Sequence, residues 1–366
     1  MLLFLLVAAT ALYVTLAVGS AVVAARGERA SLRPLDPDAK LSILVAARDE
    51  AEKLPRCLEA LRQQRGLPAQ TEFLIANDGS SDATPDVIDA FARGDARFRR
   101  LDVPEATGRL RGKAHALHHA YRHASGDLFL ITDADCAPPP DWAASLAAAL
   151  AAPDVGVACG VALVEHRTLF ESVQALDWLL GLTVASAAAR LGVPLTAMGN
   201  NMAFRRGAYE DVGGYPALPP SVTEDCALFQ AVHRTSRWRV RLLLDERLRT
   251  WTSPLHSLGD VFRQRKRWAS GGLQAAPRSV VLYALVFLVH ARLLAGLIVV
   301  PTIALLLLFL KAFADLLVLG VAGRRMDVRL PLRAFPLFEI YLFGYVLLMP
   351  FALLFTPAIA WKGRSW

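Results

Sequence analysis

The sequence has few cysteines, and none of them is spaced for the usual cysteine chemistry. The four are Cys57, Cys136, Cys159 and Cys226, and no two have the spacing of a zinc site or a redox motif. We therefore expect reduced thiols in the cytoplasm. Two of these cysteines directly follow an aspartate, but a small buried apolar side chain explains them equally well.

Charge is absent from the first 25 residues. This stretch is long enough to cross about 30 Å of hydrocarbon as a helix. A secretory signal has a basic segment before its apolar run, whereas the first charge here, Arg26, comes after it. We predict a retained membrane anchor over 1–25 and a linker over 26–40, with a cleaved signal as the alternative. Positive charge beside a membrane segment collects on the cytoplasmic side, and the anchor is followed by Arg26, Arg29 and Arg33. We therefore expect the soluble part on the cytoplasmic side of the cell (plasma or inner) membrane.

No recognisable nucleic-acid-binding motif accompanies the net charge of +7. The basic residues are densest over 263–267 and 324–333, beside apolar segments. This favours anionic lipid headgroups and substrate phosphates as partners over nucleic acid, so we expect no nucleic-acid partner. The apolar fraction of 54% is too high for an ordinary soluble protein. We predict a C-terminal membrane region over 280–361 with about three spans, or with a broken helix near Pro350 and Pro357.

Apolar runs alternate with helical patterns through the middle of the chain. Strands are expected over 41–47, 72–76, 127–132 and 156–164. Helices are expected over 50–64, 113–123 and 169–189, and another helix follows the turn at 77–80 and ends near residue 93. This alternation predicts an α/β fold with a mostly parallel central sheet and helices on both faces. Asp49, Asp78 and Asp133 each follow a strand, so we expect them to share one crevice at the carboxyl ends of the strands.

Asp133 and Asp135 lie one residue apart at the end of an apolar strand. Carboxylate oxygens are the ligands that Mg²⁺ and Mn²⁺ prefer, and such an ion could also hold a diphosphate. Two aspartates at this spacing also occur by chance, and aspartate is common in turns, so their position after a strand is what favours a metal site. Near the second strand end, Asp78 could bond a base or ribose or belong to a helix-capping turn, and Lys113 could neutralise a phosphate or be solvated.

Glu224 and Asp225 precede an apolar helical stretch. An acidic residue in a first helical turn stabilises the helix, which is one explanation of Asp225. The other explanation is a general base that takes the proton of an acceptor hydroxyl.

Gln264, Arg267 and Trp268 share one face of a predicted helix. This face could bind the leaving diphosphate and the acceptor, or it could belong to a helix at the membrane surface.

The order of these motifs resembles the inverting family 2 glycosyltransferases, which have a GT-A nucleotide-sugar-binding domain. The resemblance covers 41–272. It implies a nucleotide site at Ala47, Arg48, Asp49, Glu50, Asp78, Lys113 and Asp133, a metal at Asp133 and Asp135, and an acceptor side at Gly199, Asn200 and Asn201. It also implies a catalytic set of Asp225, Glu224, Gln264, Arg267 and Trp268. Asp49 and Asn77 depart from the family, which usually has Asn and Asp there.

The resemblance implies a membrane-bound enzyme of the hexosyltransferase type. We expect it to use Mg²⁺ or Mn²⁺ and to move a sugar from a nucleotide diphosphate sugar to a hydroxyl of a membrane lipid. The resemblance implies that the donor is a UDP-sugar. The final motif is similar to that of the ceramide-glucosyltransferase-like enzymes. A processive polysaccharide synthase is the nearest alternative, and a catalytically silent membrane scaffold is an alternative from another class.

Overall fold

The computed structural model describes residues 2–29, 35–106, 108–275, 279–355, 360–361 and 364–365. The chain forms two compact units. The sheet unit comprises Glu28–Leu163 and Thr196–Ser253, and the helical unit comprises Met1–Gly27, Val164–Leu195 and Pro254–Trp366.

A seven-stranded sheet forms the centre of the sheet unit, with strand order β3-β2-β1-β4-β7-β5-β8. Four of its strand pairs are parallel, and β7 runs antiparallel to both β4 and β5. The predicted mixed α/β architecture with a mostly parallel sheet is therefore confirmed. The strands are β1 (Lys40–Ala47), β2 (Gln70–Asn77), β3 (Phe98–Asp102), β4 (Leu128–Asp133), β5 (Val155–Cys159), β7 (Asn201–Arg205) and β8 (Arg239–Leu242).

Nearly continuous apolar runs make β1, β2 and β4 the buried middle of this sheet. Most of their side chains are inaccessible to solvent, as expected for parallel strands covered on both faces. The helices of this unit are α2 (Leu54–Arg62), α3 (Thr84–Gly94), α4 (Gly112–Arg122), α5 (Trp142–Ala148), α7 (Arg206–Asp211), α8 (Gly214–Ala217), α9 (Glu224–Arg234) and the 3₁₀ turn η1 (Glu246–Leu248).

Two expected elements differ from the structure. The strand expected over 156–164 is divided into β5 and β6 (Ala162–Val164), because the amide of Gly160 bonds to the carbonyl of Asn201 and β6 then pairs with β9 (Thr250–Thr252). The helix expected from residue 50 begins at Leu54, after a turn closed by the carbonyl of Glu50. Strand β3 was not predicted, since its side chains are mostly polar or partly exposed at the sheet edge.

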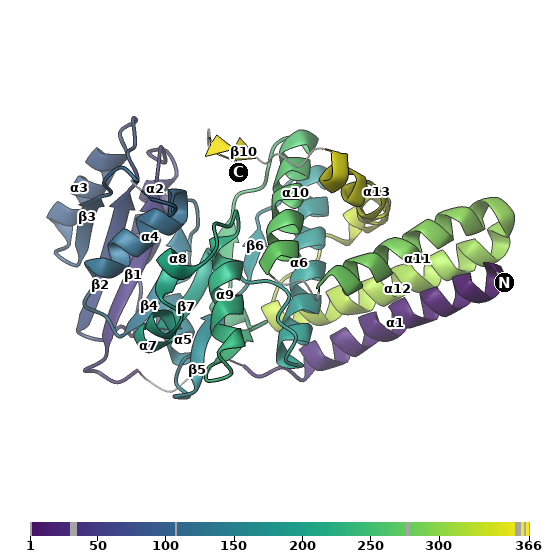
Figure 1. Cartoon of the computed structure of the whole chain (residues 1–366), viewed down its shortest axis with the longest axis horizontal. Helices are drawn as coiled ribbons and strands as arrows, with labels where there is room; N and C mark the ends of the chain where they lie inside the picture. The colour runs from purple at the N-terminus through teal and green to yellow at the C-terminus, as the bar shows by residue number, and fades with distance from the viewer. Residues whose placement is uncertain are drawn as a thin grey trace. The chain divides into compact units, whose positions relative to one another are not determined.

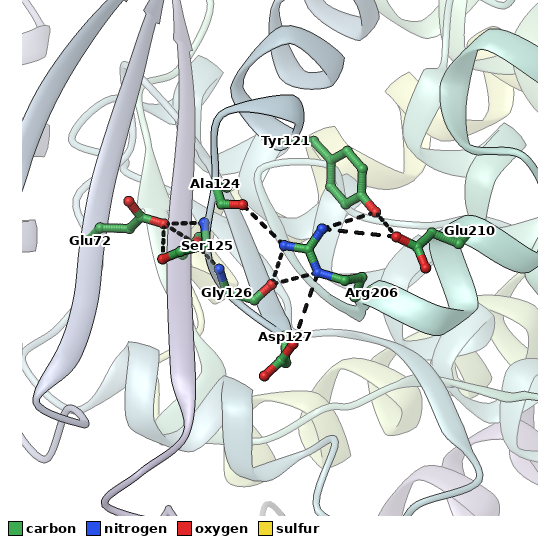
Figure 2. Close-up of polar contacts among 9 residues, drawn as sticks. Glu72, Tyr121, Ala124, Ser125, Gly126, Asp127, Arg206 and Glu210 are labelled. Carbon is green, nitrogen blue, oxygen red and sulfur yellow. Dashed lines mark hydrogen bonds and ion pairs between the residues drawn. The ribbon is translucent and has the colours of Figure 1, made fainter.

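Arg206 and Glu72 hold the loop that leads into β4 (Figure 2). The guanidinium of Arg206 donates to the carbonyl oxygens of Ala124 and Gly126, and its shortest bond is 2.6 Å. The carboxylate of Glu72 accepts hydrogen bonds from the amide and the hydroxyl of Ser125. Both side chains thus satisfy backbone groups just before β4 and help to set where that strand begins.

The helical unit contains α1 (Leu2–Ala25), α6 (Leu169–Arg190), α10 (Leu258–Ala275), α11 (Ser279–Val299), α12 (Pro301–Met326), η2 (Leu332–Ala334) and α13 (Phe335–Phe355), and the chain also has the short strands β10 (Ala360–Trp361) and β11 (Arg364–Ser365). Figure 1 shows α1 beside α11 and α12, although they are far apart in the sequence. Leu6 packs there against Val289, Leu293 and Ala304. Thr168 and Glu171 form a reciprocal capping box at the start of α6.

Five helices in the described part of the chain are long and apolar enough to cross a membrane, judged by length and composition. Four of the segments, Leu3–Ala25, Ser279–Val299, Pro301–Met326 and Leu332–Phe355, coincide with the predicted anchor and the three predicted C-terminal spans. The fifth, Leu169–Arg190, was predicted as a helix only. The predicted last span extended to Trp361, but α13 ends at Phe355, and residues 356–359 lie outside the described residues.

Candidate active site

The carboxyl ends of β2, β1 and β4 are neighbours at one edge of the sheet. Residues Ala47 and Asn77 are paired in register at the ends of β1 and β2, and Ala46 is paired with Asp133 at the end of β4. The amide of Asp78 donates to the carbonyl of Ala47 at 2.9 Å. The sequence therefore placed Asp78 and Asp133 correctly at the carboxyl ends of β2 and β4, the two strands that flank β1, and open sheets of this kind bind ligands at such ends.

Asp49 lies at the same edge, but its carboxylate faces a loop. Its Oδ1 accepts hydrogen bonds from the amide of Ser81 at 2.7 Å and from its hydroxyl at 3.1 Å. Its backbone adopts a φ of 53°, a conformation that Asp and Asn tolerate better than most residues. Neighbouring Arg48 has a guanidinium nitrogen 4.0 Å from Oδ2 of Asp78. Arg48 and Asp78 thus lie close together at this edge, while Asp49 shapes the loop.

The family that the sequence resembles usually has aspartate where this chain has Asn77, and the contacts of Asn77 explain the asparagine. Its amide nitrogen donates to Oδ1 of Asp102 on β3 at 2.8 Å, and its Oδ1 accepts from the amide of Ser80 at 3.2 Å. Because Asn77 is 7% exposed, an aspartate there would place a buried carboxylate against the exposed carboxylate of Asp102. Asp102 was not predicted as part of the site, since β3 itself carries no clear strand pattern.

Asp133 and Asp135 bring two carboxylates to the end of β4, beside Glu50. Burial and then the charges of Asp133 and Glu50 raise the pKa of Asp135 above its ordinary value. A cation would relieve this repulsion, so the pair fits a divalent ion. Among the described residues no group of three potential ligands is assembled for a metal, which leaves the other coordination positions to a diphosphate or water.

Lys113 links the two halves of the site. Its Nζ lies 2.6 Å from Oδ1 of Asp133 and 3.4 Å from Oε1 of Glu224, and it donates to the carbonyl of Gly199 at 3.5 Å. Burial opposes the charge of this lysine, but the nearby carboxylates raise its pKa overall. The ammonium therefore stays charged and joins the end of β4 to the start of α9.

Asp225 lies in the first turn of α9 and is held through both carboxylate oxygens. Its Oδ2 accepts from the amide of Gly199 at 2.6 Å, and its Oδ1 accepts from the amide of Cys226 at 2.8 Å. Burial and then the charge of Glu224 raise the pKa of Asp225 to about 6, although Lys113 acts in the opposite direction. A carboxylate with this pKa is ionised at neutral pH and is basic enough to accept a proton during a reaction.

The segment Gly199, Asn200 and Asn201 was expected on the acceptor side, and its three residues differ. Gly199 contacts Asp225, and the Oδ1 of Asn200 is buried without a hydrogen-bond partner. Asn201 is fully buried: its amide accepts from Trp142 at 2.8 Å and donates to the carbonyl of Leu248 at 2.6 Å. Asn200 therefore has a free bonding position next to Gly199, which contacts Asp225, whereas the amide of Asn201 is engaged within the fold.

Gln264, Arg267 and Trp268 lie on α10, as the predicted helix required. They belong to the helical unit, whereas the carboxylates and Lys113 belong to the sheet unit. The structure also brings Arg265, which was not predicted, over the ring of Trp268 with its guanidinium carbon 4.4 Å from the ring centroid. No sequence signal distinguished this arginine from the other basic residues of the segment.

Comparison with known families and proteins shows which of them this chain resembles. The model described as Glycosyl transferase family 2 matches residues 42–213, and the model described as Glycosyl transferase family group 2 matches residues 128–359. A mannosyltransferase from Pyrobaculum calidifontis, solved in complex with GDP-Man and Mn²⁺, is similar over 97% of this chain and 99% of its own, with a TM-score of 0.62. Their sequences are 22% identical, so this likeness supports the fold.

Among curated proteins, the chain is similar to a poly-beta-1,6-N-acetyl-D-glucosamine synthase from Staphylococcus epidermidis, with 26% identity over 237 residues. The synthase of the same name from Staphylococcus aureus is 26% identical over 239 residues. Both matches cover 63% of this chain and 54% of the relative, so the chain spans about half the length of these relatives. Since the longer family match covers more than half of the chain, the chain belongs to glycosyltransferase family 2.

Proposed function

We propose that this enzyme transfers a sugar from a nucleotide diphosphate sugar to a hydroxyl of a membrane lipid, with inversion at the anomeric carbon. The observation that carries the proposal is the contact of Lys113 with both Asp133 and Glu224. This contact brings the carboxylates expected to meet the donor diphosphate next to the pair expected to meet the acceptor. A single site of this kind can hold both substrates and position them for in-line displacement.

The donor occupies the edge formed by the ends of β1, β2 and β4. Arg48 and Asp78 meet the nucleoside, Glu50 lies beside the metal carboxylates, and the carbonyl of Ala47 holds the turn at Asp78. We propose a uridine nucleotide. The mannosyltransferase with a similar fold was solved with GDP-Man, which supports a nucleotide diphosphate sugar as donor and makes the base a matter for experiment.

Asp133 and Asp135 hold a divalent cation, Mg²⁺ or Mn²⁺, together with the donor diphosphate. When bound, the ion supplies positive charge to the leaving diphosphate. The presence of Mn²⁺ with the similar mannosyltransferase supports this assignment. Lys113 lies against Asp133 and adds a second positive charge on the same side.

Asp225 acts as the general base. It takes the proton of the acceptor hydroxyl while the acceptor oxygen bonds to the anomeric carbon, and the bond from that carbon to the diphosphate breaks with its electrons going to the phosphate oxygen. The two backbone amides that hold Asp225 fix its orientation for this step. Glu224 positions Lys113, and Asn200 offers its unpartnered oxygen to an acceptor hydroxyl.

The helix α10 completes the proposal. Arg267 stabilises the departing diphosphate, and Gln264 and Trp268 contact the acceptor. We propose that the chain belongs to the ceramide-glucosyltransferase-like subgroup, whose final motif the segment 264–268 resembles. The catalytic domain, 41–272, faces the cytoplasm at the cell membrane, anchored by 1–25 and by the spans within 280–361. The helices that follow α10 support a lipid acceptor, because they are long and apolar enough to cross a membrane and come directly after this segment in the sequence.

A second candidate acceptor is a growing polysaccharide. The curated relatives are named poly-beta-1,6-N-acetyl-D-glucosamine synthases, which favours saccharide extension. Both candidates use the same donor side and the same base, and they differ in what the enzyme presents to Asp225. The product therefore decides between them.

The test is transfer from labelled nucleotide sugars in membranes that contain the enzyme, followed by partition between organic solvent and water. Metal chelation and Asp225→Asn serve as controls, and Asp225→Asn should bind nucleotide normally. Label in the organic phase that depends on both metal and Asp225 supports lipid glycosylation. Label in a large water-soluble product supports the polysaccharide synthase. Near-normal turnover by Asp225→Asn would contradict the assigned base under either acceptor.

A further inference from the structure

In the helical unit, Asp177 connects three helices through one oxygen. Its Oδ2 accepts from Nε of Arg265 at 2.7 Å and lies 2.6 Å from the NH2 nitrogen of the same guanidinium. The hydroxyl of Tyr341 donates to the same oxygen at 3.4 Å. Asp177 belongs to α6, Arg265 to α10 and Tyr341 to α13. The aspartate thus ties the helix carrying Gln264 and Trp268 to two others.

Arg265 is almost fully buried, with 4% of its surface exposed. Its guanidinium lies over the ring of Trp268 at 4.4 Å and over that of Trp178 at 5.5 Å. The two indoles meet edge to face, with centroids 4.4 Å apart. A buried guanidinium needs an anionic partner, and Asp177 supplies it. Arg265 can therefore fix the orientation of Trp268, but it can do so only as long as Asp177 holds the guanidinium.

The remaining nitrogen of Arg265 sets the orientation of Gln264. NH1 of Arg265 donates to Oε1 of Gln264 at 2.7 Å. A guanidinium has only donors, so the oxygen of the glutamine amide must face it. The NH2 group of Gln264 is then the part that can bond a ligand, and its partner must be an oxygen that accepts a hydrogen bond.

We propose that Asp177 is a positioning residue for sugar transfer, and that it acts through Arg265. It fixes the amide of Gln264 as a donor toward an oxygen of the acceptor and fixes the ring of Trp268 beside it. The inference rests on the proposed acceptor role of Gln264 and Trp268. It adds to that role a residue from α6, outside the motif, and a chemical requirement: the acceptor group at Gln264 is a hydroxyl or other oxygen with a free lone pair.

The sharpest test is Arg265→Lys. A lysine keeps the positive charge opposite Asp177, but its single ammonium cannot reproduce the planar fork that reaches Asp177 and Gln264 together. Arg263→Lys is the matched control, because Arg263 lies on the same helix, is 67% exposed and pairs with Asp260 at the surface. Asp177→Asn and Gln264→Ala complete the set.

The measurements are kcat and KM for the acceptor, the affinity for the nucleotide sugar that supports transfer, and the thermal midpoint in detergent. We expect Arg265→Lys and Asp177→Asn to lower kcat/KM for the acceptor by about tenfold or more, since a misplaced contact group costs rate. Nucleotide-sugar affinity should stay within about twofold, and Arg263→Lys should match the wild type. A purely structural role would lower the thermal midpoint without this selective effect on the acceptor.

Each result has a definite consequence. Wild-type acceptor kinetics in Arg265→Lys would overturn the inference even if Asp177→Asn does not fold. If Gln264→Ala lowers transfer while Arg265→Lys and Asp177→Asn do not, the inference alone fails. If Gln264→Ala itself transfers normally, the proposed acceptor role of the segment fails, and the inference fails with it.

Discussion

The amide of Gly199 donates a 2.6 Å hydrogen bond to Oδ2 of Asp225. The approach leaves no space for a side chain at position 199. A Cβ built there would lie 2.7 Å from both Cβ and Oδ2 of Asp225, closer than real contacts allow. Glycine at 199 is thus a condition for holding Asp225 where it lies.

Gly199→Ala should therefore displace Asp225 and lower kcat by about a hundredfold, because a shift of about 1 Å in a reacting group has that order of effect. Gly94→Ala is the matched control, since a Cβ at Gly94 would meet nothing within 4 Å. The measurement is the transfer rate of both variants at saturating substrates, with thermal midpoints to establish folding. Equal rates for the two alanine variants would contradict the proposed position of the base.

The rate of transfer should depend on the ionisation of Asp225. Burial, followed by the charge of Glu224, raises the pKa of Asp225 to about 6. Only the carboxylate can accept the acceptor proton, so kcat/KM should fall as the pH decreases through about 6, and about tenfold for each further unit. A pH profile from 5 to 8 at constant ionic strength checks this. A rate independent of pH across this range would exclude Asp225 as a base with a raised pKa.

Lys113 should set the pH at which kcat/KM falls on the acid side of the profile, called the acid limb below. Its charge favours the ionised form of Asp225, opposing burial and Glu224. Lys113→Gln removes this charge, so the pKa of Asp225 should rise and the acid limb should move to higher pH. The profile must be recorded at saturating donor, because the same substitution weakens the positive charge near Asp133. A limb that stays in place, or moves to lower pH, would show that Lys113 does not act on Asp225.

Much of this site could be predicted from the sequence because its elements are local. Asp78 and Asp133 follow apolar strands, and parallel strands bring their carboxyl ends to one edge. Asp225 was placed in a first helical turn from its position before an apolar helical stretch, and α9 confirms that placement. Patterns of this kind require no knowledge of distant contacts.

The remaining relationships join residues that are far apart in the chain. Gly199 meets Asp225 across 26 positions, and Asp177 meets Arg265 across 88. Asn77 meets Asp102 on an edge strand whose polar side chains hide it from pattern analysis. Hydrophobic periodicity specifies which face of an element is buried, but not which polar group on another element it meets.

Arg206 should stabilise the sheet unit without taking part in the reaction. Its guanidinium donates to the carbonyls of Ala124 and Gly126 (Figure 2). It also lies over the ring of Phe129, with its carbon 5.0 Å from the ring centroid. Arg206→Ala should lower the free energy of unfolding by about 1–3 kcal/mol, since it removes charged hydrogen bonds to part-buried carbonyls. Denaturant titration measures this. The exposed Arg122 on α4 gives a control, for which an alanine should cost less than about 0.5 kcal/mol.

Asn200 and Asn201 offer a matched pair that separates binding from stability. The Oδ1 of Asn200 is buried without a partner, so Asn200→Ala removes no hydrogen bond at that oxygen and should leave the thermal midpoint nearly unchanged. If that oxygen meets an acceptor hydroxyl, the KM for the acceptor should rise severalfold, in keeping with about 1 kcal/mol for one hydrogen bond.

Asn201→Ala should behave in the opposite way. It deprives the buried Nε1 of Trp142 and the carbonyl of Leu248 of their partners, which should cost about 2–4 kcal/mol of stability from two unsatisfied groups. Acceptor KM of the molecules that remain folded should change little, because the amide of Asn201 is engaged within the fold. Thermal midpoints and acceptor kinetics on both variants give the comparison. A rise in acceptor KM for Asn201→Ala alone would reverse the assignment and make Asn201 the acceptor residue.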